Sequence, residues 1–138
     1  MTELQAFRNE ISNYEFYKNK VKKLYEELED LFYKFFGVRG VDPSKEALEN
    51  KNLNALDEQR LENIEKYDQI QKEINSQILH YEKRISMIED RMSRMSQVTR
   101  NIFEYIYIKH YSYYKTCRLL DISIGELQYN MKKEFKED

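Results

Sequence analysis

The sequence predicts an all-α fold in which two long helices form an antiparallel hairpin and a C-terminal helix-turn-helix follows. Three observations indicate this class. The chain of 138 residues contains only three Gly and one Pro, the residues that most strongly interrupt helices. Charged residues make up 35% of it and apolar residues 41%, a balance typical of helices with solvated faces. Apolar residues also recur at three- and four-residue spacing, which is the period of a helix face.

The first long helix is predicted from an apolar seam that runs from Leu4 to Phe35. The seam keeps a heptad-like spacing with one polar interruption, at Lys18. Its members are Leu4, Phe7, Ile11, Tyr14, Val21, Tyr25, Leu28, Phe32 and Phe35. Other apolar residues beside the seam widen the stripe, which indicates packing against more than one neighbour. These additional residues are Phe16, Leu24, Leu31 and Phe36.

The second long helix is predicted from a similar seam, interrupted only at Gln71. Its members are Ile64, Tyr67, Ile74, Ile78, Tyr81, Ile85, Ile88, Met92 and Met95. Between the two helices lies the loop 37–54, whose two glycines and Pro43 end the first helix and allow a short helix to start. We interpret this loop as the connection of the hairpin. A direct contact of Arg39 and Lys45 with a partner or with DNA is the alternative.

The predicted organisation is a hairpin and oligomerisation region at 1–95 and a helix-turn-helix region at 96–138. In the second region Ser96 is a typical N-cap for a helix at 97–110, and Ser112 for a helix at 113–120. Ser123 and Glu126 then have the spacing of a capping box at the start of a last helix, Ile124–Phe135. Leu127, Met131 and Phe135 follow at four-residue steps and are expected to face inward.

This C-terminal pattern meets the requirements of a helix-turn-helix. Cys117 is a small residue that allows close helix approach, while Leu120 and Ile122 flank the turn. The last helix then presents polar side chains that are able to bond to base edges or phosphates. Residues 91–138 carry 9 Lys and Arg against 6 Asp and Glu, whereas residues 1–90 carry 14 against 19. The charge difference of +3 against −5 is of the kind that accompanies nucleic-acid binding.

The segment "YSYYKTCRLLDISIGELQYNMKKEF" resembles the helix-turn-helix of sigma-factor region 4. The whole chain resembles the RinA/ArpU-type phage late-transcription regulators. The likeness lies in its length, its two long helices, the "GVRGVDPSKE" break and the end "RNIFEYIYIKHYSYYKTCRLLDISIGELQYNMKKEF". The resemblance implies an activator of phage or phage-related late genes for packaging and structural proteins. It also implies that Ile124–Phe135 is the DNA-recognition helix.

The residues expected to contact DNA are Ser123, Gly125, Glu126, Gln128, Tyr129, Lys132, Lys133, Lys115 and Arg118. Two features depart from the family pattern. Asp121 stands at a turn position where such motifs often have Gly, and Glu126 places a negative charge near phosphates. Because the recognition helix has no Arg, we expect affinity to depend on the lysines and Arg118. In the alternative interpretation, the lysines at the end of this helix only complement the helix dipole.

Other functional classes find no support in the sequence. A single cysteine, Cys117, allows no disulfide framework, and no apolar run approaches the ~20 residues of a membrane span. We therefore expect a soluble, intracellular protein, and the resemblance to phage regulators implies the cytoplasm of a bacterial host cell. His80 and His110 have no neighbouring ligand pattern for a metal, and no phosphate-binding loop or catalytic grouping is present. Neither enzymatic activity nor a cofactor is expected.

The predicted partners are double-stranded promoter DNA, bacterial RNA polymerase, and a second copy of the chain bound through the long helices. Two other functions stay open at this point. The first is a small-terminase-type packaging subunit, which also combines DNA recognition with helical oligomerisation. The second is a helical protein-interaction module without DNA binding. The Tyr-rich stretch "YIYIKHYSYY" is interpreted as core and rim aromatics, not as a platform for stacked bases.

Overall fold

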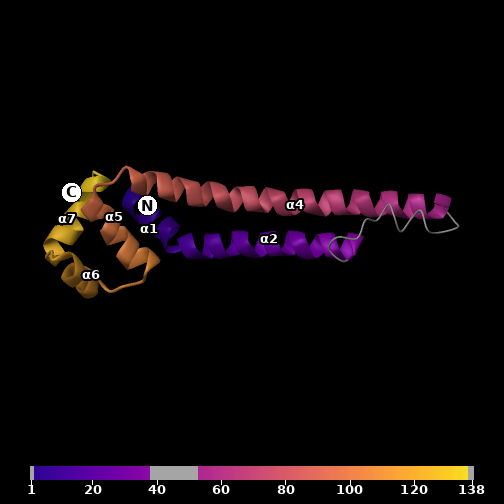
Figure 1. Ribbon diagram of the computed structural model, residues 1–138. Coiled ribbons are helices and arrows are strands. Elements are labelled where there is room, and N and C mark those ends of the chain that lie inside the picture. The colour runs from indigo at the N-terminus through magenta and orange to yellow at the C-terminus, as the bar shows by residue number, and fades with distance from the viewer. Residues whose placement is uncertain (1, 38–52, 137–138) are drawn as a thin grey trace. The chain divides into compact units, whose positions relative to one another are not determined.

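The computed structural model describes residues 2–37 and 53–136, and in these ranges the chain is helical, without a strand. The helices are α1 (Glu3–Ser12), α2 (Tyr14–Phe36), α4 (Leu53–Ser93), α5 (Gln97–Phe103), the π-helical segment η1 (Glu104–Ile108), α6 (Tyr113–Leu120) and α7 (Ile124–Glu134) (Figure 1). The predicted all-α class is thus confirmed. The short helix predicted near Pro43 and the alternative role of Arg39 and Lys45 lie outside the described residues.

The chain divides into two compact units. One combines residues 1–19 with residues 82–138, and the other consists of residues 20–81. Both α2 and α4 contribute one part of their length to each unit. The boundary predicted between residues 95 and 96 lies inside the first of these units, because α1 and the end of α4 pack with the C-terminal helices.

The unit of residues 20–81 has a core of aliphatic side chains from α2 and α4. Leu24, Leu31, Ile74 and Ile78 are buried together. Partly buried residues pack around them: Val21, Leu28, Phe35, Tyr67 and Tyr81. At the end of α2, the rings of Phe35 and Phe36 lie 6.2 and 4.9 Å from the ring of Tyr67. This core uses alternating three- and four-residue steps on both helices, as a heptad seam does.

The α2 part of the predicted seam is wrong by one residue at two positions, whereas Val21, Leu28 and Phe35 pack against the core as predicted. Leu24 and Leu31 are 1% and 9% exposed, whereas the predicted members Tyr25 and Phe32 are 51% and 42% exposed. The physical reason is packing against Ile74 and Ile78 of α4, which buries Leu24 and Leu31 in place of the neighbouring aromatic rings. The helix break before α2 lies at Asn13, which caps α1 with φ −97° and ψ 6°. Branched aliphatic side chains then fill the α2 seam.

The predicted seam of α4 is confirmed over most of its length. Ile74, Ile78, Ile88 and Met92 are buried, as is Met95 just after the helix. The exception is Ile64, which is 40% exposed. The two seams therefore differ in how well a single periodic pattern describes them, because α4 continues unbroken from Leu53 to Ser93.

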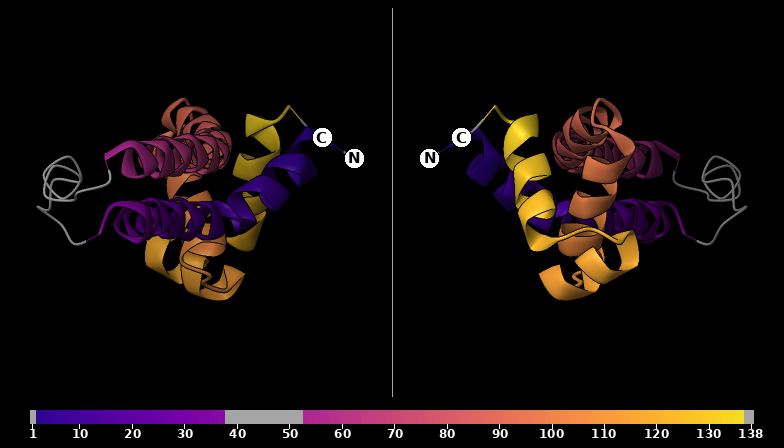
Figure 2. Two further views of the ribbon diagram at one scale, coloured as in Figure 1. Left: turned by 90° about the vertical axis from the view of Figure 1, so that its right-hand side faces the viewer. Right: turned by 90° about the vertical axis from the view of Figure 1, so that its left-hand side faces the viewer.

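The unit of residues 1–19 and 82–138 is centred on three phenylalanine rings. Phe7 of α1 lies 5.1 Å from Phe103 of α5 and 5.3 Å from Phe135, the C-cap of α7, as ring-centroid distances. Phe103 and Phe135 complete the triangle at 6.1 Å. The C-terminal end of α7 therefore packs beside α1 (Figure 2). Such aromatic contacts contribute about 0.5–1.5 kcal/mol each beyond the burial of apolar area.

Polar contacts position the helix break at Asn13 in this unit. Glu10, in the last turn of α1, accepts a hydrogen bond from the Tyr17 hydroxyl at 3.1 Å. The same carboxylate pairs with Arg84 of α4 at 3.1 Å. This hydrogen bond raises the pKa of Arg84, and burial raises the pKa of Tyr17. Glu10 therefore links both sides of the break to α4.

We expect substitutions in the α2 seam to distinguish the observed phase from the predicted one. Leu24→Ala removes a side chain that is 1% exposed and should lower the free energy of unfolding by about 2–5 kcal/mol. Tyr25→Ala, its matched neighbour, should cost less than about 1 kcal/mol because the ring is half exposed. Urea denaturation followed by circular dichroism measures both values. An equal or larger cost for Tyr25→Ala would contradict the assignment.

Candidate nucleic-acid interface

Helix α6 begins at a cap that the sequence predicts. The Ser112 hydroxyl accepts a hydrogen bond from the Lys115 backbone N–H at 3.0 Å, and the Ser112 carbonyl accepts one from the Thr116 hydroxyl at 2.9 Å. Thr116 and Cys117 are buried, with 0% and 8% exposure. Their small side chains let α7 contact α6 closely. The predicted bounds of α6 are confirmed, and Cys117 is buried beside the turn.

A short turn joins α6 to α7 through a left-handed residue. Asp121 has φ 55° and ψ 50°, and the N–H of Ile122 donates to the Cys117 carbonyl at 3.0 Å. This is the six-to-one hydrogen bond of a Schellman ending. Ser123 then returns to extended geometry and caps α7 by accepting the Glu126 N–H at 3.1 Å. The Ser123 half of the predicted capping box is therefore formed.

The inner side of α7 is anchored at both ends. Leu127 and Met131 are fully buried and Phe135 is 9% exposed, which confirms the predicted inward side chains. At the end of the helix, the Arg91 guanidinium pairs with the Glu134 carboxylate at 2.9 Å and donates to its backbone carbonyl at 3.0 Å. The same guanidinium lies 4.5 Å from the ring centroid of Phe135. These contacts hold α7 in one orientation against the end of α4.

The outer side of α7 and the outer side of α6 carry the residues predicted to contact DNA. All nine are exposed: Ser123, Gly125, Glu126, Gln128, Tyr129, Lys132 and Lys133 at α7, and Lys115 and Arg118 on α6. Gly125, Gln128, Tyr129 and Lys132 follow i, i+3, i+4 and i+7 spacing, so one side of the helix presents them together. Lys115 and Arg118 are likewise one turn apart. The first turn of α7 also exposes the negative charge of Glu126.

Three lysines in this region lie over tyrosine rings of their own segment. Lys133 lies over Tyr129 at 5.8 Å, Lys115 over Tyr111 at 4.0 Å and Lys109 over Tyr105 at 4.8 Å, from Nζ to ring centroid. Each pair has the spacing Tyr-x-x-x-Lys. The sequence pattern predicted Tyr105 and Tyr111 to be core and rim aromatics and predicted no DNA contact for Lys109. The repeated Tyr-x-x-x-Lys spacing is the signal that would have singled out these residues, since a lysine near a tyrosine in sequence is able to lie over its ring.

The segment before α6 departs from α-helical geometry. The predicted helix at 97–110 ends two residues earlier, and its last turn is π-helical: the Lys109 N–H bonds to the Glu104 carbonyl at 2.9 Å. His110 then takes a left-handed backbone with φ 60°. Tyr107 stacks on Phe103 with ring centroids 5.8 Å apart. Burial, followed by a hydrogen bond with Tyr113, raises the pKa of Tyr107 far above its usual value, so it stays a neutral hydroxyl.

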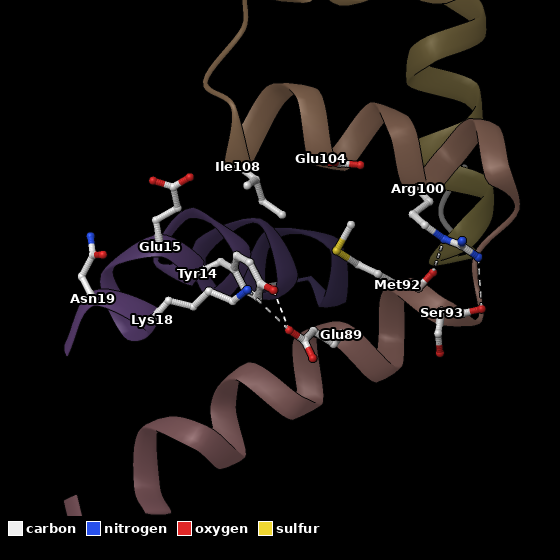
Figure 3. A pocket seen from close by; sticks show the side chains of 10 residues that line it. All are labelled: Tyr14, Glu15, Lys18, Asn19, Glu89, Met92, Ser93, Arg100, Glu104 and Ile108. Carbon is white, nitrogen blue, oxygen red and sulfur yellow. Dashed lines mark hydrogen bonds and ion pairs between the residues drawn. The ribbon is translucent and has the colours of Figure 1, made fainter. Parts of the chain in front are cut away.

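A groove of about 650 Å³ lies elsewhere in this unit, between the start of α2, the end of α4 and the α5–η1 segment (Figure 3). Its polar side chains contact one another. The Tyr14 hydroxyl donates to the Glu89 carboxylate at 2.6 Å, and Lys18 lies 4.0 Å from the same carboxylate. Burial and this hydrogen bond raise the pKa of Tyr14. Arg100 donates to backbone carbonyls at the end of α4, at 3.1 Å to Met92. These contacts position helices.

Other site types are not represented in the described residues. Within residues 2–37 and 53–136, no group of three or more His, Cys, Asp or Glu side chains is placed to hold a metal ion. None of the helices in these ranges has an apolar stretch long enough to cross a bilayer. Comparison of the chain with protein-family models, curated proteins and solved structures found no match. The candidate interface therefore depends on its own geometry and chemistry.

We expect Asp121→Gly to stabilise the protein. A left-handed backbone costs a non-glycine residue about 1–2 kcal/mol, part of which is offset by the greater entropy of glycine in the unfolded chain. The free energy of unfolding should rise by about 0.5–1 kcal/mol, which thermal denaturation measures. Asp121→Ala is the matched control and should bring no such gain, since it keeps the Cβ atom. Destabilisation by Asp121→Gly would show that the carboxylate, not the backbone, stabilises the turn.

Proposed function

We propose that this chain is a sequence-specific DNA-binding transcriptional regulator. In this proposal α6 and α7 form a helix-turn-helix, and α2 and α4 form an antiparallel hairpin. The observation that carries the proposal is the geometry of residues 112–135. A left-handed turn residue and a serine-capped helix follow a helix with small buried side chains, and the capped helix buries an apolar side while exposing a polar one. This combination is typical of helix-turn-helix motifs.

In the proposed complex α7 enters the major groove and presents Gln128, Tyr129 and Lys132 to base edges. Gln is suited to bidentate contact with adenine, and Lys to guanine. The N-terminal turn of α7, where Gly125 lies, approaches a phosphate through its backbone N–H groups. Glu126 accepts from a cytosine amino group in this arrangement, which gives its exposed carboxylate a partner.

Affinity in this proposal comes mainly from contacts with the phosphate backbone. Lys115 and Arg118 on α6 and Lys132 and Lys133 on α7 are exposed and carry the positive charge. Such contacts orient a protein on DNA and make its affinity depend on salt, but they carry no sequence information. The helix has no Arg for stronger direct recognition of guanine. Binding as a dimer would increase the affinity of such a recognition helix.

The dimer is proposed to form through the long helices. In the unit of residues 20–81, both helices expose apolar side chains besides the core: Tyr25, Phe32, Leu61, Ile64, Ile70 and Leu79. Together with the resemblance to RinA/ArpU-type regulators, this supports an activator of phage or phage-related late genes. We propose that it acts by recruiting RNA polymerase to the promoter. The bacterial cytoplasm is the location that this activity requires.

A footprint on DNA flanking the gene's own operon, at stated salt, tests this function. A dimer should protect two half-sites related by a twofold axis and separated by about one helical turn, 10–10.5 base pairs. Replacing Gln128, Tyr129 and Lys132 together with Ala should remove the footprint, while the far-UV circular dichroism spectrum stays unchanged because all three are exposed.

Three outcomes, from the footprint and from native mass spectrometry, would argue against the proposal. A specific footprint that survives the triple substitution would show that α7 is not the recognition helix. A ring of many copies by native mass spectrometry would favour a small-terminase-type packaging subunit. A protein that binds no duplex would favour a protein-interaction module.

Gly125 provides a second test, because the fold does not require glycine there. Its backbone lacks a positive φ, and an added Cβ would lie 3.8 Å from the Ser123 Oγ, an ordinary contact. Gly125→Ala should therefore stabilise the helix by up to about 1 kcal/mol. The same methyl group should weaken DNA binding, since it separates the first turn of α7 from the phosphate. A gain in thermal stability without a loss of affinity, measured by fluorescence anisotropy, would exclude the proposed close approach.

A further inference from the structure

Four residues before and within α6 form what we call the Tyr–Lys cluster: Tyr105, Lys109, Tyr111 and Lys115. The rings of Tyr105 and Tyr111 lie 5.8 Å apart and are partly buried. Each ring lies under one exposed ammonium group, Lys109 at 4.8 Å and Lys115 at 4.0 Å. The three distances form a path from one ammonium group through the two ring centroids to the other. The two Nζ atoms are therefore less than about 15 Å apart. The π-helical turn and the left-handed His110 bring Tyr111 back beside Tyr105, whose carbonyl accepts the Tyr111 N–H at 2.8 Å.

The rings restrict the two lysines in a way that an ordinary surface lysine is not restricted. A cation over an aromatic ring gains about 0.5–1 kcal/mol at an exposed site. Ordering of a lysine side chain on binding costs up to about 2 kcal/mol of conformational entropy. Part of that ordering is already achieved in the free protein. The ammonium groups also cover a face of each ring, which disfavours stacking of a base on that face.

The positive charge of the cluster is not neutralised within the described part of the chain, where no carboxylate lies within ion-pairing distance of Lys109 or Lys115. The Tyr14–Lys18 pair, which has the same spacing and lies in the same unit, shows the contrast. Lys18 lies over Tyr14 at 4.8 Å, but it is also 4.0 Å from the Glu89 carboxylate. The same local geometry thus gives Lys18 a carboxylate partner, whereas Lys109 and Lys115 keep their positive charges without one in the described part of the chain.

The position of Lys115 on α6 connects the cluster to the candidate interface. Lys115 is one turn before Arg118 on the exposed side of α6. Its ammonium group therefore belongs both to the Tyr–Lys cluster and to the cations of the candidate interface. Lys109 lies before α6, directly after η1, and so extends the basic surface beyond the two helices of the proposed helix-turn-helix. A duplex that contacts Lys115 and Arg118 therefore has phosphates within reach of the cluster.

We propose that the Tyr–Lys cluster is a second DNA-backbone contact, which binds phosphates of the duplex outside the half-site contacted by α7. Tyr105 and Tyr111 are positioning residues that hold the ammonium groups of Lys109 and Lys115 in place. The cluster adds affinity for any duplex sequence and does not contribute to base discrimination. This inference rests on the proposed function, because it assumes that the chain binds duplex DNA.

The test compares Lys109→Gln with the matched variant Lys18→Gln in the full chain, on the footprinted duplex and on a scrambled duplex of equal length. Lys109 is substituted alone because Lys115 already belongs to the proposed interface. The slope of log K against log [salt] should become shallower by about 0.9 in Lys109→Gln, because one phosphate contact is lost. Affinity for both duplexes should fall by the same factor. Lys18→Gln should leave slope and affinity unchanged.

Substitutions of the rings test the positioning role. Tyr105→Phe/Tyr111→Phe keeps both rings and should bind as the unsubstituted protein does. Tyr105→Leu/Tyr111→Leu keeps both lysines and should lower affinity while the salt slope stays unchanged, because the charges remain but are no longer held. Thermal denaturation identifies any of these variants that loses its fold. Equal affinity of the Leu and Phe variants would remove the positioning role.

The possible failures are distinguishable. A wild-type protein that binds neither duplex overturns the proposed function and this inference together. Specific binding by the wild-type protein with an unchanged slope in Lys109→Gln overturns this inference alone. A loss confined to the footprinted duplex would make the cluster a specificity determinant, contrary to what is proposed.

Discussion

The contact of Phe7, Phe103 and Phe135 is the interaction on which the unit of residues 1–19 and 82–138 depends. It joins the first helix of the chain to the end of α7, with the fully buried Phe103 between them. Truncation of such a buried ring typically costs about 3–5 kcal/mol. Because α7 ends on these rings and on the Arg91–Glu134 pair, the orientation of the proposed recognition helix depends on α1. The N-terminal segment is thus a structural part of the candidate interface.

The turn at Asp121 sets the direction of α7 and so determines which of its side chains face solvent. The left-handed residue costs energy, and the Ile122–Cys117 hydrogen bond and the Ser123 cap offset that cost by satisfying the ends of two helices. Leu127 and Met131 then fix the rotation of α7 about its axis. The consequence is that its polar side faces solvent in one defined register, as a helix that contacts base edges requires.

The local distribution of charge describes the candidate interface better than the net charge of −2 does. The cations of the candidate interface lie beside the negative charges of Asp121 and Glu126, so overall charge does not predict how it meets a polyanion. Tyrosine rings also hold the ammonium groups of Lys109 and Lys115 in defined places, which a count of charged residues does not reveal. At Lys18 a carboxylate neutralises the cation, whereas at Lys109 and Lys115 the described chain supplies none.

Helix class, the caps at Ser96, Ser112 and Ser123, and the α4 seam were determined by the sequence alone, because caps and periodicity act over a few residues. The exposure of all nine candidate residues could be predicted from the same periodicity. Only the tertiary structure decided which of two adjacent side chains enters the α2 seam, since packing against α4 selected Leu24 over Tyr25 and Leu31 over Phe32. It also decided that α1 packs against α5 and α7, and that the π-helical turn brings Tyr111 beside Tyr105. These depend on contacts between distant segments and on backbone geometry that no local pattern encodes.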